Sequence, residues 1–410
     1  KKVCGLNFLN CLEEGTITDP QYLIKYSILS LERDSKNYYF IVQGCIAMIN
    51  YTYLRPKKAK ILEEWHNIDF KFRNDLSANE YKNATILPLK KVAGDNLLFG
   101  RGGVIDSEKN YINSSAIDGR IQFSYEFENA EYQNKKVVYC GYLVNHWGHF
   151  LVEAVSRIWY CLKNDISVDE YVFFYNYNEN HELKGNYNEF FELLGILDKI
   201  KIINKPTTYR EVIVPELAYK RRKYYSQEYK DIFDTIVSNV KDVDITPSEK
   251  IFLTRSQLKN AIKKEPGIEM IDDFFYKNGY KIISPEKISL SQLILYIRNA
   301  RKCAAVSGTL PHNMLFGSDN QELIIVERNV LNNEIQADLN LIKNLDVTYI
   351  DANLAVYPIN LGQGPFVLSY LGKLQVFAKD NGYVPPNKKY YTDKYIKKSF
   401  KLYMKFYRRY

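Results

Sequence analysis

The sequence IFLTR at residues 251–255 is a short run of β-branched and aromatic residues that ends in a positive charge, and three similar runs follow it: YKIIS (280–284), KCAAV (302–306) and ELIIVE (322–327). Segments with apolar residues at helical spacing separate these runs. Strands that alternate with helices predict right-handed βαβ units and a parallel sheet covered by helices. We therefore predict an α/β fold for this half of the chain.

Polar residues gather where the predicted strands end. Ligands of open parallel sheets bind at the carboxyl ends of the strands, and the residues there are Arg255, Glu286, Ser307, Gly308, Thr309 and Glu327. Gly308 permits close backbone approach, Thr309 offers a hydroxyl, and a predicted helix behind them directs free N–H groups at an anion. Arg255 would add a bidentate cation. These features predict a phosphate site, and the alternative is a plain turn with a proline in the first helical turn.

The length of 410 residues suits two domains. The polar segment DVDITPSEK (242–250) reads as a linker, and a second α/β pattern precedes it. We predict an N-terminal α/β domain over residues 1–245, a C-terminal Rossmann-like domain over residues 246–385, and a basic tail over residues 386–410.

The segment NHWGHFLVEAVSR (145–157) predicts a helix that follows a strand. His149, Glu153 and Arg157 are spaced i, i+4, i+8 along one face of that helix, with His146 a turn earlier. A carboxylate one turn from an imidazole orients it and raises its basicity, which is the usual support for a general base. The alternative is a surface ladder of charges with no chemical role.

Two groups of residues could hold a metal ion, but neither matches the pattern that such a site normally has. His146 and His149 could share a metal, but zinc normally has three protein ligands of defined geometry, and the chain has no H-E-x-x-H pattern. Asp242 and Asp244 form the D-x-D pair that holds a cation on a sugar nucleotide in some enzymes, yet they lie in the predicted linker. We predict no metal and no other cofactor.

The net charge of +8 is carried by the tail alone, because residues 387–410 contain seven lysines, two arginines and one aspartate. A nucleic-acid-binding surface would be spread over a folded domain, so we expect no nucleic-acid partner. At helical spacing one side of the tail is apolar, with Ile396, Phe400, Tyr403, Tyr407 and Tyr410. Such a helix suits an anionic membrane surface over residues 390–410. The alternative is a helix docked on its own protein.

The six cysteines are scattered without a C-x-x-C pair, which is typical of reduced thiols in a cytosolic protein. The longest uncharged run, Tyr38–Leu54, is shorter and more polar than a membrane-spanning helix. We expect a cytoplasmic protein associated peripherally with the inner face of the membrane.

In these segments the sequence resembles glycosyltransferase family 61, in its bacterial capsular-polysaccharide branch, over roughly residues 80–330. The resemblance rests on six motifs in family order: GGVID (102–106), NHWGHFLVEAVSRIW (145–159), FLTR (252–255), GYKIISPEKISLSQ (279–292), SGTLPHNMLF (307–316) and IIVE (324–327). It implies two Rossmann-like domains that face a cleft, the GT-B architecture. It also implies a nucleotide-sugar donor, inversion at the anomeric carbon, and no metal.

The resemblance also implies roles for single residues. His149 and Glu153 match the family's histidine and acidic position, and Arg255 matches its strand-end arginine. The other matched donor-site positions are Glu286, Gln292, Gly308, Asn313 and Glu327. The chain departs from the family at Ser307 and Thr309, where many members have His and Ala, and in the segment around Glu269.

We therefore expect an inverting, metal-independent glycosyltransferase of capsular or surface polysaccharide assembly. His149, oriented by Glu153, would deprotonate a glycan or lipid-linked acceptor, with His146 and Arg157 as acceptor contacts or an alternative base. The C-terminal domain would hold the donor and the N-terminal domain the acceptor. A non-catalytic, membrane-docked glycan-binding or scaffold protein on the same fold is the alternative, and a metal hydrolase that uses His146 and His149 is a third.

Overall fold

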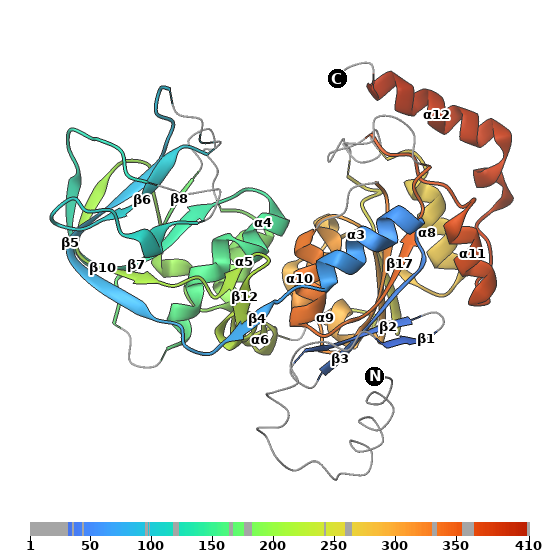
Figure 1. Ribbon diagram of the computed structural model, residues 1–410, viewed down its shortest axis with the longest axis horizontal. Coiled ribbons are helices and arrows are strands. Elements are labelled where there is room, and N and C mark those ends of the chain that lie inside the picture. The colour runs from blue at the N-terminus through green and yellow to red at the C-terminus, as the bar shows by residue number, and fades with distance from the viewer. Residues whose placement is uncertain are drawn as a thin grey trace, which may run out of the picture. The chain divides into compact units, whose positions relative to one another are not determined.

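The structure is a computed structural model, which describes residues 32–34, 37–42, 45–94, 97, 99–117, 123–163, 167–175, 183–241, 243–258, 265–329, 334–354 and 365–407. The chain divides into two compact units. Unit 1 comprises the described residues of Lys1–Asp69, Val243–Ile288 and Gln292–Tyr410. Unit 2 comprises those of Phe70–Asp242 together with Ser289–Ser291 (Figure 1).

Unit 1 is built on an eight-stranded sheet with the order β1-β2-β3-β17-β16-β15-β13-β14. The strands from β3 to β14 are parallel, and β1 and β2 extend the sheet as antiparallel neighbours. Their bounds are β1 Glu32–Asp34, β2 Asn37–Val42, β3 Cys45–Tyr53, β13 Lys250–Leu253, β14 Lys281–Ile283, β15 Lys302–Val306, β16 Glu322–Glu327 and β17 Asp346–Asp351. The mixed α/β fold with a parallel sheet is therefore confirmed.

Both faces of this sheet are buried, because successive strand residues alternate between two apolar clusters. Ile251 and Leu253 pack on the side of α3 and α9, whereas Phe252 packs on the side of α8 and α11. The helices of unit 1 are α3 Pro56–His66, α8 Ile268–Lys277, α9 Leu290–Asn299, α10 Glu334–Ile342, α11 Lys373–Asp380 and α12 Asp393–Tyr407. Because helices and apolar side chains cover both faces of the sheet, a ligand can reach it only at the ends of the strands.

Unit 2 is built on a six-stranded sheet with the order β6-β5-β10-β7-β8-β9. Strands β10, β7, β8 and β9 are parallel, while β5 and β6 are antiparallel additions. Their bounds are β5 Ala78–Lys90, β6 Arg101–Ile105, β7 Glu131–Leu143, β8 Glu170–Tyr175, β9 Ile200–Ile203 and β10 Thr207–Pro215. Shorter strands β4 Lys71–Arg73, β11 Tyr219–Lys220 and β12 Tyr224–Ser226 form a small second sheet.

The helical segments of unit 2 lie between its strands in the chain. They are η1 Asn113–Ser115, α4 Trp147–Val152, η2 Ala154–Leu162, α5 Asn186–Leu193, η3 Leu197–Lys199 and α6 Gln227–Ser238. The side chain of Ser226 caps α6 by accepting the backbone N–H of Tyr229 at 3.4 Å. Residues of the sheet, among them Val137, Tyr139 and Val212, form an apolar cluster with Ile112 and Ile117, which flank η1.

The first described segments join unit 1, which differs from the predicted N-terminal domain of residues 1–245. Strand β3 pairs in parallel with β17, and Leu62 of α3 packs in the same cluster as Val347 of β17. Figure 1 shows β3 and α3 in blue among the orange and red elements of unit 1. The sequence pattern missed this placement because the pairing joins residues about 300 positions apart.

Two predicted helices differ from expectation. The helix expected over residues 145–157 is α4 followed by a 3-10 helix, η2. The helix expected after Gly308 is a seven-residue 3-10 segment, η5 Leu310–Phe316. A 3-10 helix has poorer hydrogen-bond geometry than an α-helix, so η5 offers a weaker dipole than predicted.

The C-terminal helix α12 rests partly on unit 1. Ser399 and Tyr403 are buried, and the hydroxyl of Tyr395 donates to Glu269 on α8 at 2.6 Å. Phe400 and Leu402 are 39% and 40% exposed. Among the described residues, no helix has both the length and the apolar character that a membrane crossing requires.

Candidate active site

The imidazole of His149 and the carboxylate of Glu153 are in contact at the carboxyl end of β7. His149 Nδ1 lies 3.0 Å from Glu153 Oε1, and the other carboxylate oxygen accepts a hydrogen bond from the hydroxyl of Tyr142. The side chain of His149 is 32% exposed and that of Glu153 is 12% exposed. A partly exposed imidazole that is held through one nitrogen is suited to proton transfer through the other.

The end of α4 places these two groups. The N–H of Glu153 bonds to the carbonyl of His149 at 2.7 Å, which is the last α-type bond of the helix. The N–H of Ser156 then bonds to the carbonyl of Glu153 at 3.3 Å, which is a 3-10 bond. The α turn therefore supplies the i, i+4 contact that the sequence predicted. His146 precedes α4, and its ring centroid lies 4.9 Å from that of His149.

Arg157 does not join this pair. Four residues of a 3-10 helix turn the chain through about 480°, against about 400° in an α-helix, so Arg157 leaves the face of Glu153. The residue is 1% exposed. Its guanidinium donates to the backbone carbonyls of Ser114, Ala116 and Pro215 at 2.6, 3.0 and 3.0 Å.

Arg157 also lies over the ring of Tyr139, at 5.3 Å from the ring centroid. Burial lowers the pKa of this guanidinium from its ordinary value. The predicted contact between Arg157 and an acceptor finds no support in this placement, since the side chain is packed inside unit 2.

The carboxyl edge of the unit 1 sheet carries a second cluster of charges. Arg255 follows β13, and its Nε lies 3.3 Å from Oε1 of Glu265. Arg328 follows β16, and its Nη1 donates to that same oxygen. The Arg255 side chain is 26% exposed, whereas Glu265 is 2% exposed. Two guanidinium groups thus meet at one buried carboxylate.

The turn after β15 lies beside Arg328. The hydroxyl of Ser307 accepts the backbone N–H of Arg328 at 3.3 Å. Gly308 has a φ of +119°, and a Cβ atom there would lie 2.6 Å from Nη2 of Arg328. Thr309 stands at the cap of η5, and the amide of Asn313 is buried and donates to the carbonyl of Leu310 at 2.8 Å. Gly308 is thus required both for its backbone angle and for space.

The remaining predicted donor residues are dispersed. Glu327 is buried at the end of β16, and the ammonium of Lys58 on α3 lies 2.9 Å from its Oε2. Glu286 is exposed in the short 3-10 segment Pro285–Lys287. Gln292 on α9 donates to the carbonyl of Asp244 at 3.5 Å. The structure brings Arg255, Ser307 and Gly308 together, but Glu327 is already held by Lys58.

Sequence reasoning missed three residues of this edge: Lys58, Glu265 and Arg328. Glu265 lies four residues before Glu269, in the segment where the chain departs from the family pattern, and Glu269 itself binds Tyr395. Arg328 directly follows the last residue of β16. Its position as a charged residue one step beyond a buried strand was the signal that could have identified it.

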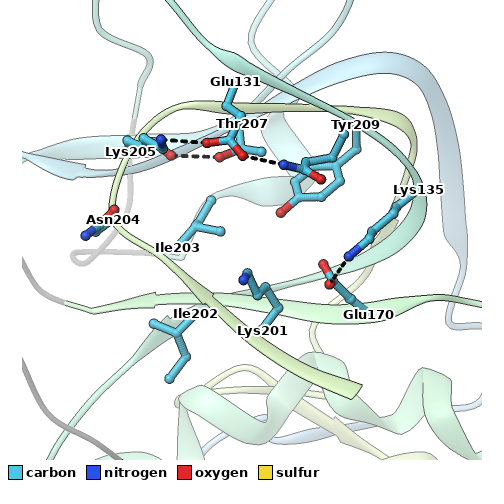
Figure 2. Close-up of a pocket in the computed structure, with 11 residues that line it drawn as sticks. Glu131, Lys135, Glu170, Lys201, Ile202, Ile203, Asn204, Lys205, Thr207 and Tyr209 are labelled. Carbon is cyan, nitrogen blue, oxygen red and sulfur yellow. Dashed lines mark hydrogen bonds and ion pairs between the residues drawn. The ribbon is translucent and has the colours of Figure 1, made fainter. Parts of the chain in front are cut away.

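A pocket of about 170 Å³ opens at the other end of the unit 2 sheet (Figure 2). It is lined by β9, by the loop that follows β9, and by the first residues of β7, β8 and β10, whereas His149 follows the end of β7. Four of its charged groups are paired, with Lys205 2.6 Å from Glu131 and Lys135 bonded to Glu170. The pocket contains no predicted site residue.

The described residues contain no group of three or more histidine, cysteine, aspartate or glutamate side chains placed to hold a metal ion. Asp242, one half of the D-x-D pair, lies outside the described residues.

Comparisons with known proteins give one family. Residues 147–324 match the family model described as Glycosyltransferase 61. The match includes His149, Glu153, Arg255 and Gly308. No curated protein matches the chain. A similar solved structure is the glycosyl transferase family 9 protein from Veillonella parvula DSM 2008, at 10% identity over 60% of this chain and 97% of that chain, with a TM-score of 0.29. A TM-score of this size does not establish a shared fold.

Proposed function

We propose that this chain, which is a glycosyltransferase with a family 61 match, transfers a sugar from a nucleotide-sugar donor to a hydroxyl of a glycan or lipid-linked saccharide, with inversion and without a metal ion. The pathway would be the assembly of a capsular or other surface polysaccharide. The observation that carries the proposal is the chain of contacts from Tyr142 to Glu153 to His149 at the end of a parallel strand.

The contacts of His149 suit a general base. Its Nδ1 faces Glu153 at 3.0 Å, so a ring with its proton on Nδ1 has a lone pair on Nε2. In the proposed reaction Nε2 takes the proton of the acceptor hydroxyl while that oxygen attacks the anomeric carbon. The bond from the anomeric carbon to the diphosphate breaks in the same displacement, and the diphosphate leaves with the electron pair.

Charge on the departing diphosphate would be met by Arg255 and by the turn at Gly308. Arg255 is partly exposed at a strand end, and Gly308 allows the backbone to come close to a ligand. Preorganised donors of this kind stabilise the negative charge that develops on the leaving diphosphate. A divalent cation stabilises this charge in other glycosyltransferases. We also propose the GT-B architecture, because the resemblance to glycosyltransferase family 61 implies it.

We also propose that α12 brings the enzyme to the cytoplasmic face of an anionic membrane. Five lysines of the helix are exposed: Lys394, Lys397, Lys398, Lys401 and Lys405. Phe400 and Leu402 flank them and are more than a third exposed. A cationic face with apolar flanks suits the headgroup region of a bilayer. Tyr403, which the sequence assigned to the membrane side, is instead buried against unit 1.

The experiment that tests the function is turnover with a panel of nucleotide sugars, preceded by a thermal-shift screen of nucleoside diphosphates. A ligand at 100 times its dissociation constant stabilises a protein by about 2.7 kcal/mol. Arg255→Ala should weaken binding of the stabilising nucleotide by about 1.5–3 kcal/mol, the scale of a charged hydrogen bond. EDTA should change neither binding nor turnover. A folded protein that turns over no donor with a lipid-linked acceptor would favour the non-catalytic alternative.

A further inference from the structure

The two arginines of unit 1 stand on either side of the turn that contains Gly308. Strand β15 lies between β13 and β16 in the sheet, and all three are parallel. Arg255 follows β13, Arg328 follows β16, and the turn follows β15. Parallel strands end at the same edge of a sheet. The two guanidinium groups and the turn at Gly308 therefore lie next to one another at the carboxyl edge of the unit 1 sheet.

The position of Arg328 is fixed from four directions. Its Nη1 donates to Glu265, its backbone N–H donates to Ser307, and its guanidinium lies 4.7 Å from the ring centroid of Phe366. On the fourth side lies Gly308, which leaves room for Nη2 because a Cβ atom there would approach it to 2.6 Å. A side chain that is 8% exposed and held in this way has little freedom to move.

The charges of this cluster do not balance. Among the described residues, Arg255 and Arg328 pair with one carboxylate, that of Glu265, which leaves one positive charge in excess. The nearby carboxylate of Glu327 is taken up by Lys58 at 2.9 Å. Arg255 Nε is buried and makes no hydrogen bond to any described residue, although it lies 3.3 Å from Glu265 Oε1. The excess positive charge of two arginines, one of them partly exposed at a strand end, favours a bound anion.

We propose that Arg328 is a second anion-binding arginine of the donor site and that, with Arg255, it selects a diphosphate over a single phosphate. Glu265 positions both guanidinium groups, and Gly308 leaves the space that Arg328 requires. Each guanidinium has five N–H donors, so each keeps donors beyond its contact with Glu265. A ligand with two linked phosphates can meet both groups at once, whereas one phosphate cannot. The inference rests on the proposed function, since it assigns the site to a nucleoside diphosphate.

The test compares pyrophosphate with inorganic phosphate by calorimetry on the full chain. We expect the unaltered protein to bind pyrophosphate at least about tenfold more tightly than phosphate. Arg328→Lys should lose most of that preference, because lysine keeps the positive charge but lacks the planar pair of N–H donors of a guanidinium. Gly308→Ala should have the same effect through displacement of Arg328. Arg301→Gln is the matched control, because Arg301 is an exposed arginine of unit 1 at the start of β15 and should leave the ratio unchanged.

Arg328→Gln leaves Glu265 buried beside one arginine fewer, so it can fail for reasons of folding. The double variant Glu265→Gln/Arg328→Gln removes both charges of that pair, and its thermal unfolding shows whether the fold persists. In a folded double variant we expect phosphate binding to persist and the preference for pyrophosphate to be lost. An unchanged preference in Arg328→Lys or in the folded double variant would overturn the role of Arg328.

The source of the diphosphate is tested separately. A nucleoside diphosphate should bind more tightly than an isoprenyl diphosphate, and the reverse order would overturn the assignment to a donor site. If the unaltered protein binds pyrophosphate with a preference that depends on Arg255 but not Arg328, only this inference fails. If it binds neither pyrophosphate nor any nucleoside diphosphate, the proposed function fails with it.

Discussion

Removal of the His149 imidazole should affect the chemical step alone. We expect His149→Ala to lower kcat by about 10²–10⁴ while donor affinity stays nearly unchanged, because a base acts only as the acceptor hydroxyl loses its proton. Glu153→Gln should lower kcat less, since the ring remains in place. Steady-state kinetics with calorimetry of donor binding would measure both effects.

The matched comparison is His146→Ala, whose ring lies 4.9 Å from that of His149. If that variant loses the rate and His149→Ala does not, His146 is the base. If His149→Ala unfolds at lower temperature with an unchanged rate, the pair of His149 and Glu153 is structural.

A partly buried carboxyl on α8, that of Asp272, provides a test by pH. The hydroxyl of Thr254 donates to Asp272 at 2.6 Å, and burial raises the pKa of Asp272 above its ordinary value of 3.8. Below the ordinary value both the folded and the unfolded chain hold the proton. As the pH rises through it, the unfolded chain ionises first, so the folded state loses stability relative to the unfolded one.

Asp272→Asn removes this loss and keeps an oxygen for Thr254. The midpoint of thermal unfolding should therefore rise in the variant at pH 7, and the gain should shrink toward pH 4. Melting curves at a series of pH values would measure the difference between variant and parent. A gain that grows as the pH falls would contradict the direction of the shift.

The sequence predicted the contacts that depend on neighbouring turns of the chain. His149 and Glu153 meet because they are four residues apart on an α turn, and that spacing is visible in the sequence. Arg157 could not be placed in the same way, since the change to 3-10 bonds at Ser156 has no clear sequence signal. Glu265, Arg328 and Lys58 come together only through the order of strands in the sheet. The roles of the predicted site residues remain predictions.

Helix α12 can be tested without disturbing the side on which it rests. Replacing Lys397, Lys398, Lys401 and Lys405 with glutamine removes four exposed charges and leaves Ser399 and Tyr403 buried. Each lysine near an anionic surface contributes about 1 kcal/mol, so vesicle binding should fall by well over tenfold. Thermal stability should change by less than about 0.5 kcal/mol, as for other surface changes. Flotation with anionic vesicles would measure the binding.

Deletion of residues 393–410 should abolish vesicle binding as well, and added salt should weaken the binding of the intact chain. Turnover of a water-soluble acceptor should survive in the four-lysine variant. If that variant still floats with anionic vesicles, the membrane role of α12 is wrong, and the helix serves only to cover unit 1.

Among elements, the strands were easier to predict than the helices. Apolar runs such as KCAAV and ELIIVE match β15 and β16, because a strand buried on both faces must be apolar throughout. The 3-10 segments η2 and η5 contain residues that also suit an α-helix, and packing decides between the two forms. The pairing of β3 with β17 depends on segments far apart in the chain, which no local pattern records.

The division into units predicts how the chain can be cut. A fragment of residues 70–242 contains both sheets of unit 2 and should fold by itself, with a single cooperative thermal transition. A fragment of residues 243–410 lacks β3 and α3, so β17 loses a partner strand and Glu327 loses Lys58. Breaking a buried ion pair costs about 3–5 kcal/mol. This second fragment should therefore be unfolded or aggregated.

Circular dichroism and thermal melts of the two fragments would measure these outcomes. The control is a chain in which residues 45–69 are joined to residues 243–410 by a flexible linker, which should restore folding. A stable fragment of residues 243–410 would show that β3 and α3 are accessory to unit 1. Failure of residues 70–242 to fold would place part of their core elsewhere in the chain.

The buried guanidinium of Arg157 has a consequence for the order in which unit 2 assembles. Its partners, the carbonyls of Ser114, Ala116 and Pro215, are 43, 41 and 58 residues away along the chain. A charged group is costly to remove from water until such partners are present. If η2 were buried early in folding, the guanidinium of Arg157 would be buried without its partners. The segments that contain Arg157, Ser114 to Ala116, and Pro215 must therefore pack together. A newly made chain can complete this core only after Pro215 has left the ribosome, and until then Arg157 remains in water.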